Sequence, residues 1–151
     1  MKKIQTVGII KKDNQILLGM KKRGFGSGRW NGFGGKANLG ETPKEAMVRE
    51  FFEETSIQVA DLSECGVIEF ETVEDENIIE CHFFEITKWQ GEPKESEEMR
   101  PEWFDIDSIP YEFMWPDDKF WLPLFLEGKK FSGKVLFQDN QIMIRNTISA
   151  V

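Results

Sequence analysis

The sequence is poor in the side chains that build disulfide frameworks and zinc sites. Its 151 residues include only two cysteines, Cys65 and Cys81, and one histidine, His82. Two cysteines are too few for a disulfide framework, and with a single histidine they lack the spacing of zinc ligands. We therefore expect a reducing, cytoplasmic environment.

A basic surplus and a long apolar run are also missing. The net charge of −8 leaves no excess of lysine and arginine, so we expect neither nucleic acid nor an anionic membrane as a partner. The apolar run near the N-terminus stops at Lys11, which is too short for a signal peptide, and no stretch reaches the length of a membrane span. The length predicts a single domain over residues 1–151, which we expect to be a monomer.

Hydrophobic periodicity and turn residues predict strands interrupted by two helices. The expected strands lie at 3–11 and 15–21 around an Asp13-Asn14 turn, at 66–73 and 78–87, near 102–106, and at 131–137 and 141–146. The expected helices lie at 43–54 and, despite Pro123, at 118–126. This order predicts an α+β or α/β sandwich and argues against a helix bundle or a β-barrel.

Glycines are concentrated between residues 22 and 40, where seven of the 13 in the chain occur. We expect an ordered loop here, because Phe25, Trp30 and Phe33 give it apolar surface to bury. Backbone without Cβ atoms can come close to a ligand. The first helix begins directly after this loop, at Thr42 as the cap, with Pro43 in the first turn and Glu45 completing a capping box.

The first helix carries a cluster of carboxylates. At helical spacing, one face holds Met47, Val48, Phe51 and Phe52, and the roughly opposite face holds Glu50, Glu53 and Glu54. Three glutamates alone indicate a solvated acidic face. Arg49 lies four residues from both Glu45 and Glu53 and can hold carboxylates in place, and Ala46 is small enough to let another segment approach. Together with the glycine-rich loop, these features favour a site for Mg²⁺, with Mn²⁺ as a substitute.

The residues from 35 to 57 match a known motif. The Nudix box reads G-x5-E-x7-R-E-U-x-E-E-x-G-U, where U is a bulky apolar residue. Eight of its nine specified positions agree here: Gly35, Glu41, Arg49, Glu50, Phe51, Glu53, Glu54 and Ile57. The departure is Ser56, which stands where the box has a glycine that permits a left-handed backbone.

The resemblance extends beyond the box. The runs LLGMKKRGFGSGRWNGFGGK (17–36), MRPEWF (99–104), MWPDDKFWLPLFL (114–126) and KKFSG (129–133) resemble the animal MutT-homologue family of Nudix hydrolases. This resemblance implies an α/β/α sandwich around a mixed β-sheet. It also implies hydrolysis of oxidised purine nucleoside triphosphates, such as 8-oxo-dGTP and 2-hydroxy-dATP, to monophosphate and pyrophosphate, which removes damaged nucleotides from the pool.

The resemblance also implies roles for individual residues. The metal ligands would be Gly34, Glu50, Glu53, Glu54 and Glu98. The catalytic residues would be Glu50, Glu53 and Glu98, with the general base left open between Glu53 and Glu98. The small-molecule substrate would contact Thr6, Lys21, Phe25, Asn31, Phe33, Gly35, Lys36, Phe70, Trp115, Asp117 and Asp118, with Ile79 and Met99 lining the pocket. Arg49 would orient Glu53 without binding phosphate.

Several of these residues have simpler interpretations. Trp115 and Phe70 could be core aromatics, Asp117 or Asp118 a helix cap, Glu98 part of a solvated acidic loop, and Lys21 an ordinary strand-end charge. If instead the adjacent aspartates share a pocket, one pKa should rise, and a carboxyl that gains or loses a proton could recognise both oxidised guanine and oxidised adenine. The functional alternatives are a Nudix hydrolase for another nucleoside diphosphate derivative and a catalytically weak nucleotide-binding module.

Overall fold

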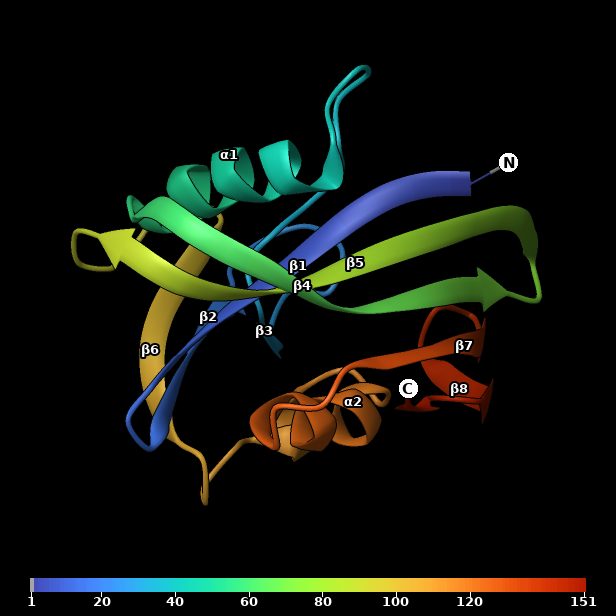
Figure 1. Cartoon of the computed structure of the whole chain (residues 1–151). Coiled ribbons are helices and arrows are strands. Elements are labelled where there is room, and N and C mark those ends of the chain that lie inside the picture. Colours follow the sequence, from blue (N-terminus) through green and yellow to red (C-terminus); the bar gives the residue numbers. More distant parts are fainter. Residues whose placement is uncertain (1) are drawn as a thin grey trace.

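The computed structural model describes residues 2–151 as a mixed β-sheet with one helix on each side (Figure 1). The strands are β1 (Lys2–Lys12), β2 (Gln15–Lys21), β3 (Trp30–Asn31), β4 (Gln58–Thr72), β5 (Asp75–Gln90), β6 (Met99–Asp105), β7 (Phe131–Gln138), β8 (Ile142–Asn146) and β9 (Ser149–Ala150). The helices are α1 (Pro43–Thr55), a short 3-10 turn at Tyr111–Phe113, and α2 (Asp118–Leu126). The expected elements are all present, but β4 begins eight residues earlier than expected, and β3 and β9 were not foreseen.

The strand order shows why the sheet is mixed. Strands follow one another as β3-β2-β1-β5-β4-β7-β8, while β6 pairs with β2 and β9 with β7. The β1–β5 and β4–β7 pairs are parallel, and the others are antiparallel. β1 pairs with β5 from Lys2 to Ile10 and with β2 only at Lys11 and Lys12. The sheet therefore curls at β1 into two parts, which confirms the α/β fold class with a mixed sheet.

Two apolar cores hold the helices against the sheet. Met47 and Phe51 of α1 are fully buried in one core, and Trp121, Leu122 and Phe125 of α2 lie in the other. Full burial of one such side chain contributes roughly 1.5–3 kcal/mol. Each helix is therefore docked mainly by its apolar side chains. Within residues 2–151, no helix is long and apolar enough to cross a membrane.

The orientation of α1 corrects the expected division into faces. Val48 and Phe52 are exposed, by 36% and 52%, whereas Glu54 is only 8% exposed. The buried side of α1 consists of Ala46, Met47, Phe51, Glu54 and Thr55. The helix is thus rotated so that one of its carboxylates points toward the sheet, where a packed apolar residue would ordinarily lie.

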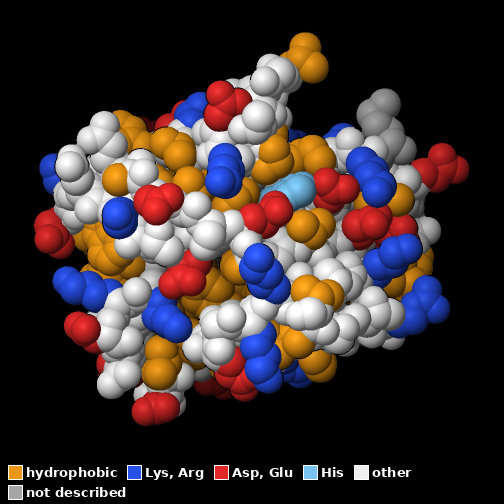
Figure 2. All heavy atoms as spheres, in the orientation of Figure 1, with side chains coloured by type: hydrophobic (Ala, Val, Ile, Leu, Met, Phe, Trp, Pro, Cys, Tyr) orange, Lys and Arg blue, Asp and Glu red, His pale blue; other side chains and the backbone are white. Residues whose placement is uncertain are grey.

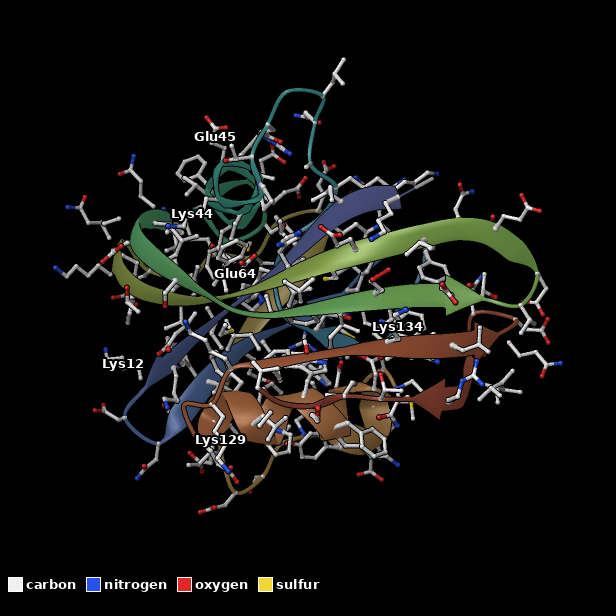
Figure 3. All side chains as sticks on the ribbon, turned by 45° about the vertical axis from the view of Figure 1, so that its right-hand side comes forward. Lys12, Lys44, Glu45, Glu64, Lys129 and Lys134 are labelled. Atoms are coloured by element: carbon white, nitrogen blue, oxygen red, sulfur yellow. The ribbon has the colours of Figure 1, made fainter. Side chains whose placement is uncertain are left out.

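Both ends of α1 are defined by local interactions. At the start, the Glu45 backbone N–H donates to Thr42 Oγ1 (3.1 Å), and the Thr42 N–H donates to Glu45 Oε1 (2.9 Å). This confirms the capping box, and it shows that Thr42, not Arg49, holds Glu45, whose label lies on the outer side of the helix in Figure 3. At the end, Ser56 has φ 67° and ψ 8°, and its N–H donates to the Phe52 carbonyl. Ser56 therefore adopts the left-handed conformation that a glycine would accept without strain.

Candidate active site

A cavity of about 600 Å³ opens on the concave face of the curled sheet. Strands β1, β4 and β5 form its floor, and the glycine-rich loop, the end of α1 and the segment from Trp115 to Trp121 form its walls. Of the residues expected at the site, the cavity is lined by Thr6, Lys21, Phe25, Asn31, Gly34, Gly35, Lys36, Glu54, Phe70, Ile79, Met99, Trp115, Asp117 and Asp118. One cavity thus joins residues from sequence positions more than a hundred apart.

Glu54 is the carboxylate of α1 that reaches the cavity. Its Oε1 accepts a hydrogen bond from the Gly34 N–H (3.0 Å). Burial raises its pKa to about 8, and the Glu50 charge adds to this, while the Gly34 hydrogen bond and the Lys21 charge act in the opposite direction. Glycine is required at position 34, because a Cβ atom there would collide with the carbonyl oxygen of Thr6.

Glu50 lies against the loop at Gly35. A Cβ atom at position 35 would come within 2.7 Å of the Glu50 carboxylate, so glycine lets the carboxylate approach the backbone. Burial raises the pKa of Glu50, and the Arg49 hydrogen bond partly offsets this effect. The site therefore contains two carboxylates, Glu50 and Glu54, that lose hydration on folding.

Arg49 organises the carboxylates around α1. Its Nε and Nη2 donate to the two oxygens of Glu41 (2.7 and 2.9 Å), and its Nη1 donates to Glu50 (2.9 Å) and Glu53 (3.3 Å). The hydrogen bond from Arg49 lowers the pKa of Glu41 to about 2. Nη2 also donates to the Lys36 carbonyl (3.1 Å). This side chain thus fixes the glycine-rich loop relative to the helix, and its polar contacts are with protein oxygens.

Glu53 and Glu98 lie outside the cavity lining. The Glu53 side chain is 56% exposed, and the Glu98 side chain is 43% exposed, with Arg23 (2.9 Å) and Lys21 (4.0 Å) beside it. Within residues 2–151, no three Asp, Glu, His or Cys side chains are grouped closely enough to hold a metal ion between them. The five expected metal ligands are therefore neighbours but do not converge on one point in this conformation.

Asp117 and Asp118 form a buried pair in the cavity wall. They are 4% and 7% exposed, and both accept hydrogen bonds from Trp121 Nε1 (3.2 and 3.0 Å). Burial raises the pKa of Asp117 to about 6, and burial followed by the Asp117 charge raises that of Asp118 well above its usual value. Asp117 precedes α2, but its side chain makes no capping hydrogen bond. The cap interpretation is therefore wrong for Asp117.

Aromatic side chains line the space beside the aspartates. Phe25 stacks on Trp115 with ring centroids 5.3 Å apart, and Phe70 stacks on Phe137 at 6.3 Å. Phe33 was expected to contact the substrate, but it does not line the cavity. It is fully buried against Phe51 on the α1 side of the sheet, since neighbouring residues of an extended loop segment point in opposite directions.

The structure adds lining residues that the sequence did not single out. They include Gln5, Cys81, Phe83, Trp121 and Phe137. Strand periodicity contains a signal for Cys81, because it lies two residues after Ile79 and therefore on the same face of β5. Helical spacing contains a signal for the contact between Trp121 and the aspartates, because Trp121 lies four residues after Asp117 and three after Asp118.

The chain matches the family model described as the NUDIX domain over residues 2–125. The chain belongs to the Nudix family. Two full-length Nudix relatives are the oxidized purine nucleoside triphosphate hydrolases of Danio rerio and Mus musculus. Each is 44% identical over 149 residues, which cover 99% of this chain and 96% of the relative. The crystal structure of a MutT protein from Bacillus halodurans superimposes with a TM-score of 0.86 at 27% identity and covers 97% of both chains.

The geometry explains the spacing of the Nudix box in this chain. Gly35 admits Glu50, Glu41 is the bidentate partner of Arg49, and Arg49 holds Glu50 and Glu53. Ile57 is fully buried in the same core as Phe51. The specified positions therefore consist of carboxylates, one arginine that arranges them and apolar residues that anchor the helix.

Proposed function

We propose that this protein hydrolyses oxidised purine nucleoside triphosphates to nucleoside monophosphates and pyrophosphate. The observation that carries the proposal is a single cavity that contains both Glu54 of the Nudix helix and the buried pair of Asp117 and Asp118. Glu54 is suited to phosphate chemistry, and the aspartate pair is suited to hydrogen bonding with a base. The names of the two relatives, oxidized purine nucleoside triphosphate hydrolases, support the same substrate class.

The aspartate pair accounts for recognition of oxidised bases. Because the pKa of each aspartate is raised, the pair keeps one proton near neutral pH and then presents both a hydrogen-bond donor and an acceptor. Moving that proton between the two carboxyls, or releasing it, adapts the site to oxidised guanine or oxidised adenine. Asn31 supplies a further polar contact, while Phe25, Phe70 and Trp115 offer aromatic faces for the purine.

The residues around α1 fit a divalent metal ion, which Nudix hydrolases typically require. The Glu54 carboxylate is buried with a raised pKa, so its charge is incompletely compensated by the protein. Carboxylates and the Gly34 carbonyl are the oxygen ligands that Mg²⁺ prefers, and Mn²⁺ can replace it. When bound, the ion supplies neutralisation of phosphate charge and a lower pKa for the attacking water. Glu50 and Glu54 would hold it, joined by Glu53 and Glu98.

The remaining steps belong to side chains of the chain itself. Lys21 and Lys36 line the cavity and carry the positive charge that the phosphates need in an acidic protein. Either Glu53 or Glu98 accepts the proton of the attacking water, since both are exposed carboxylates: Glu53 is held by Arg49 beside Glu50, and Glu98 lies near Lys21. Arg49 positions Glu50 and Glu53 for these roles and makes no contact with substrate.

The direct experiment measures pyrophosphate release with and without Mg²⁺. The panel should contain 8-oxo-dGTP, 2-hydroxy-dATP, dGTP, dATP, ADP-ribose and a dinucleoside polyphosphate. We expect metal-dependent release with kcat/KM for 8-oxo-dGTP at least ~10-fold above that for dGTP, since an unmatched buried polar group costs on the order of 1–3 kcal/mol. Faster hydrolysis of ADP-ribose or the dinucleotide would assign another Nudix substrate. Nucleotide binding without turnover would indicate a binding module.

We further infer that residues 1–151 act as one cytoplasmic domain and as a monomer. The support is the net charge of −8, which disfavours nucleic acid and anionic membranes, and the two free cysteines. Figure 2 shows acidic and basic side chains interspersed over one face of the molecule. Sedimentation at micromolar concentration should give the mass of a single chain, and a dimer would contradict the inference.

A further inference from the structure

Arg29 lies against Trp115, a residue of the proposed base site, although the sequence suggested no role for it. Its carbonyl oxygen accepts hydrogen bonds from the Lys21 N–H (3.1 Å) and from Asn31 Nδ2 (2.9 Å). Arg29 therefore positions the side chain of Asn31, which is expected to contact the base. It also positions the backbone of Lys21, whose side chain is expected to contact the phosphates. These contacts require the backbone of Arg29 but not its side chain.

The Arg29 side chain lies over Trp115. Its guanidinium carbon is 4.1 Å from the centroid of the Trp115 ring, which is close enough for a cation–π interaction. The ring is also contacted by Phe25, and a Cβ atom at Gly26 would lie 2.9 Å from it. Trp115 is thus held by the glycine-rich loop, and Arg29 supplies the polar part of that contact.

One nitrogen of the guanidinium is buried without a partner. Among residues 2–151, Arg29 Nη1 is the one buried side-chain nitrogen or oxygen without a hydrogen bond. An unmet buried donor on a charged group costs several times the net value of an ordinary hydrogen bond. Packing of the loop alone does not explain why a cation, rather than an apolar side chain, occupies this position.

The charge of Arg29 acts on the aspartate pair. The positive charge lowers the pKa of Asp117 and so opposes the effect of burial. The other groups that face the pair are the Cys81 thiol from β5, the Tyr111 hydroxyl from the 3-10 turn and Trp121 Nε1 from α2. Arg29 is the cation among these groups.

We propose that Arg29 is a positioning residue of the base site: its guanidinium, stacked on Trp115 and with one buried nitrogen unpaired, holds that ring in place for the purine and supplies the positive charge of this wall. This inference rests on the proposed function, because it concerns how the same cavity reads a base. Two properties of the side chain are needed. Its plane stacks on the indole, and its charge favours the ionised form of Asp117.

Two substitutions separate these properties. Arg29→Lys keeps the charge and loses the planar stack, whereas Arg29→Gln keeps a planar group and loses the charge. Arg100→Gln is the matched control, because Arg100 lies 5.1 Å from the Trp30 ring and outside the cavity lining. The control removes the same charge and the same kind of contact at a different tryptophan.

Steady-state kinetics with 8-oxo-dGTP give the first readout. We expect Arg29→Gln to raise KM about 5–10-fold with kcat within twofold of wild type, since Arg29 acts on base binding and not on the phosphates. The pH profile of kcat/KM has a limb that reports the ionisation of the aspartates. The midpoint of this limb should shift to higher pH by about 0.5 pH unit or more. Arg29→Lys should raise KM but leave the limb in place, and Arg100→Gln should change neither. Wild-type KM and an unmoved limb in Arg29→Gln would overturn the proposal.

The second readout needs no substrate. Carbon-13 NMR titration of the aspartate carboxyls in the free protein should show higher pKa values for Asp117 and Asp118 in Arg29→Gln than in Arg29→Lys. Unchanged titration in Arg29→Gln would overturn the electrostatic role, whichever nucleotide the enzyme prefers. Conversely, a wild-type protein that does not prefer 8-oxo-dGTP over dGTP would overturn the proposed function while the titration still decides the role of Arg29.

Discussion

Glu53 lies on the exposed side of α1, where Arg49 Nη1 holds it at 3.3 Å. Glu53→Gln keeps the size of the side chain but removes its charge and its capacity to accept the proton of water. We expect kcat to fall by at least ~10²-fold, the scale associated with loss of a general base, while circular dichroism remains that of wild type. Stopped assays of pyrophosphate release in excess Mg²⁺ give the measurement.

Two further variants make the Glu53 result decisive. Glu127→Gln is a control on an exposed glutamate outside the cavity lining, and it should leave kcat unchanged. Glu98→Gln tests the alternative base, and the larger loss of kcat identifies the proton acceptor. Near-normal turnover of Glu53→Gln would remove Glu53 from the mechanism.

Asp117 and Asp118 can be tested by isosteric amides. An asparagine cannot alternate between acceptor and donor forms by gaining a proton, so Asp117→Asn and Asp118→Asn should each reduce the ratio of kcat/KM for 8-oxo-dGTP over dGTP by ~10-fold or more. The exposed Asp107→Asn should leave the ratio unchanged. If both variants keep the wild-type ratio, the pair is structural and the base-reading role fails.

Ser56 occupies a conformation that disfavours any residue with a Cβ atom. Its φ of 67° predicts that Ser56→Gly relieves roughly 1 kcal/mol of strain, a gain partly offset by the greater unfolded-state entropy of glycine. The free energy of unfolding in urea should be unchanged or slightly higher, with activity unchanged. A large loss of stability would show that the serine hydroxyl makes a contact the protein needs.

At the scale of the element, α1 combines local helix signals with a tertiary orientation. Thr42→Ala removes the hydroxyl that accepts from the Glu45 N–H and should lower the free energy of unfolding by about 1 kcal/mol. Because Met47 and Phe51 still anchor the helix, turnover should remain near wild type at 25 °C. Urea denaturation is the measurement, and Thr42→Ser, which keeps a hydroxyl, is the control. Equal stability of the alanine and serine variants would contradict a contribution from this cap.

The start of α1 was predictable because capping depends on residues three apart in sequence. The orientation of α1 was not predictable. The helical period of 3.6 residues defines an apolar stripe, but it does not specify which side chains at the edge of that stripe become buried. Glu54 lies at that edge, and it is buried because the Gly34 N–H is there to donate to it. Val48 and Phe52 lie at the opposite edge and remain exposed.

At the scale of the molecule, the aspartate pair should make stability depend on pH. An unfolded aspartate ionises near pH 4, whereas Asp117 in the folded protein keeps its proton until about pH 6, and burial also raises the pKa of Asp118 well above its usual value. The folded state therefore binds more protons in this window, so the pair's contribution to the free energy of unfolding falls as pH rises from about 4 to about 7. Other carboxyls with shifted pKa values, Glu54 among them, are common to the wild type and a variant of the pair.

The comparison with Asp118→Asn isolates this effect. The amide does not ionise, and it also removes the neighbouring charge that acts on Asp117. We therefore expect the unfolding free energy of the variant, measured in urea without metal, to fall less between pH 4 and pH 7 than that of wild type. Parallel curves for the two proteins would show that the pair does not titrate differently in the folded and unfolded states.

The family, the capping of α1 and the approximate positions of the longer strands could be predicted from the sequence. These depend on residues close together in the chain, such as the carboxylates and Arg49 of the Nudix box, or on the two-residue period of a strand. Resemblance to a known family brought in Asp117, Asp118 and Trp115, whose individual patterns alone favour a helix cap and a core ring. The structure excludes the cap for Asp117, which is buried and makes no cap hydrogen bond.

How these parts meet could be seen only in the folded molecule. The curl of the sheet at β1 creates the concave face, and the docking of α2 places Asp117, Asp118 and Trp121 together in the wall of the cavity. Phe33, expected at the substrate, is buried in the α1 core instead, and Arg29, for which nothing was expected, lies over the ring of Trp115. Such placements depend on contacts between residues far apart in sequence, and a local pattern specifies which side chains can be buried but not which partner buries them.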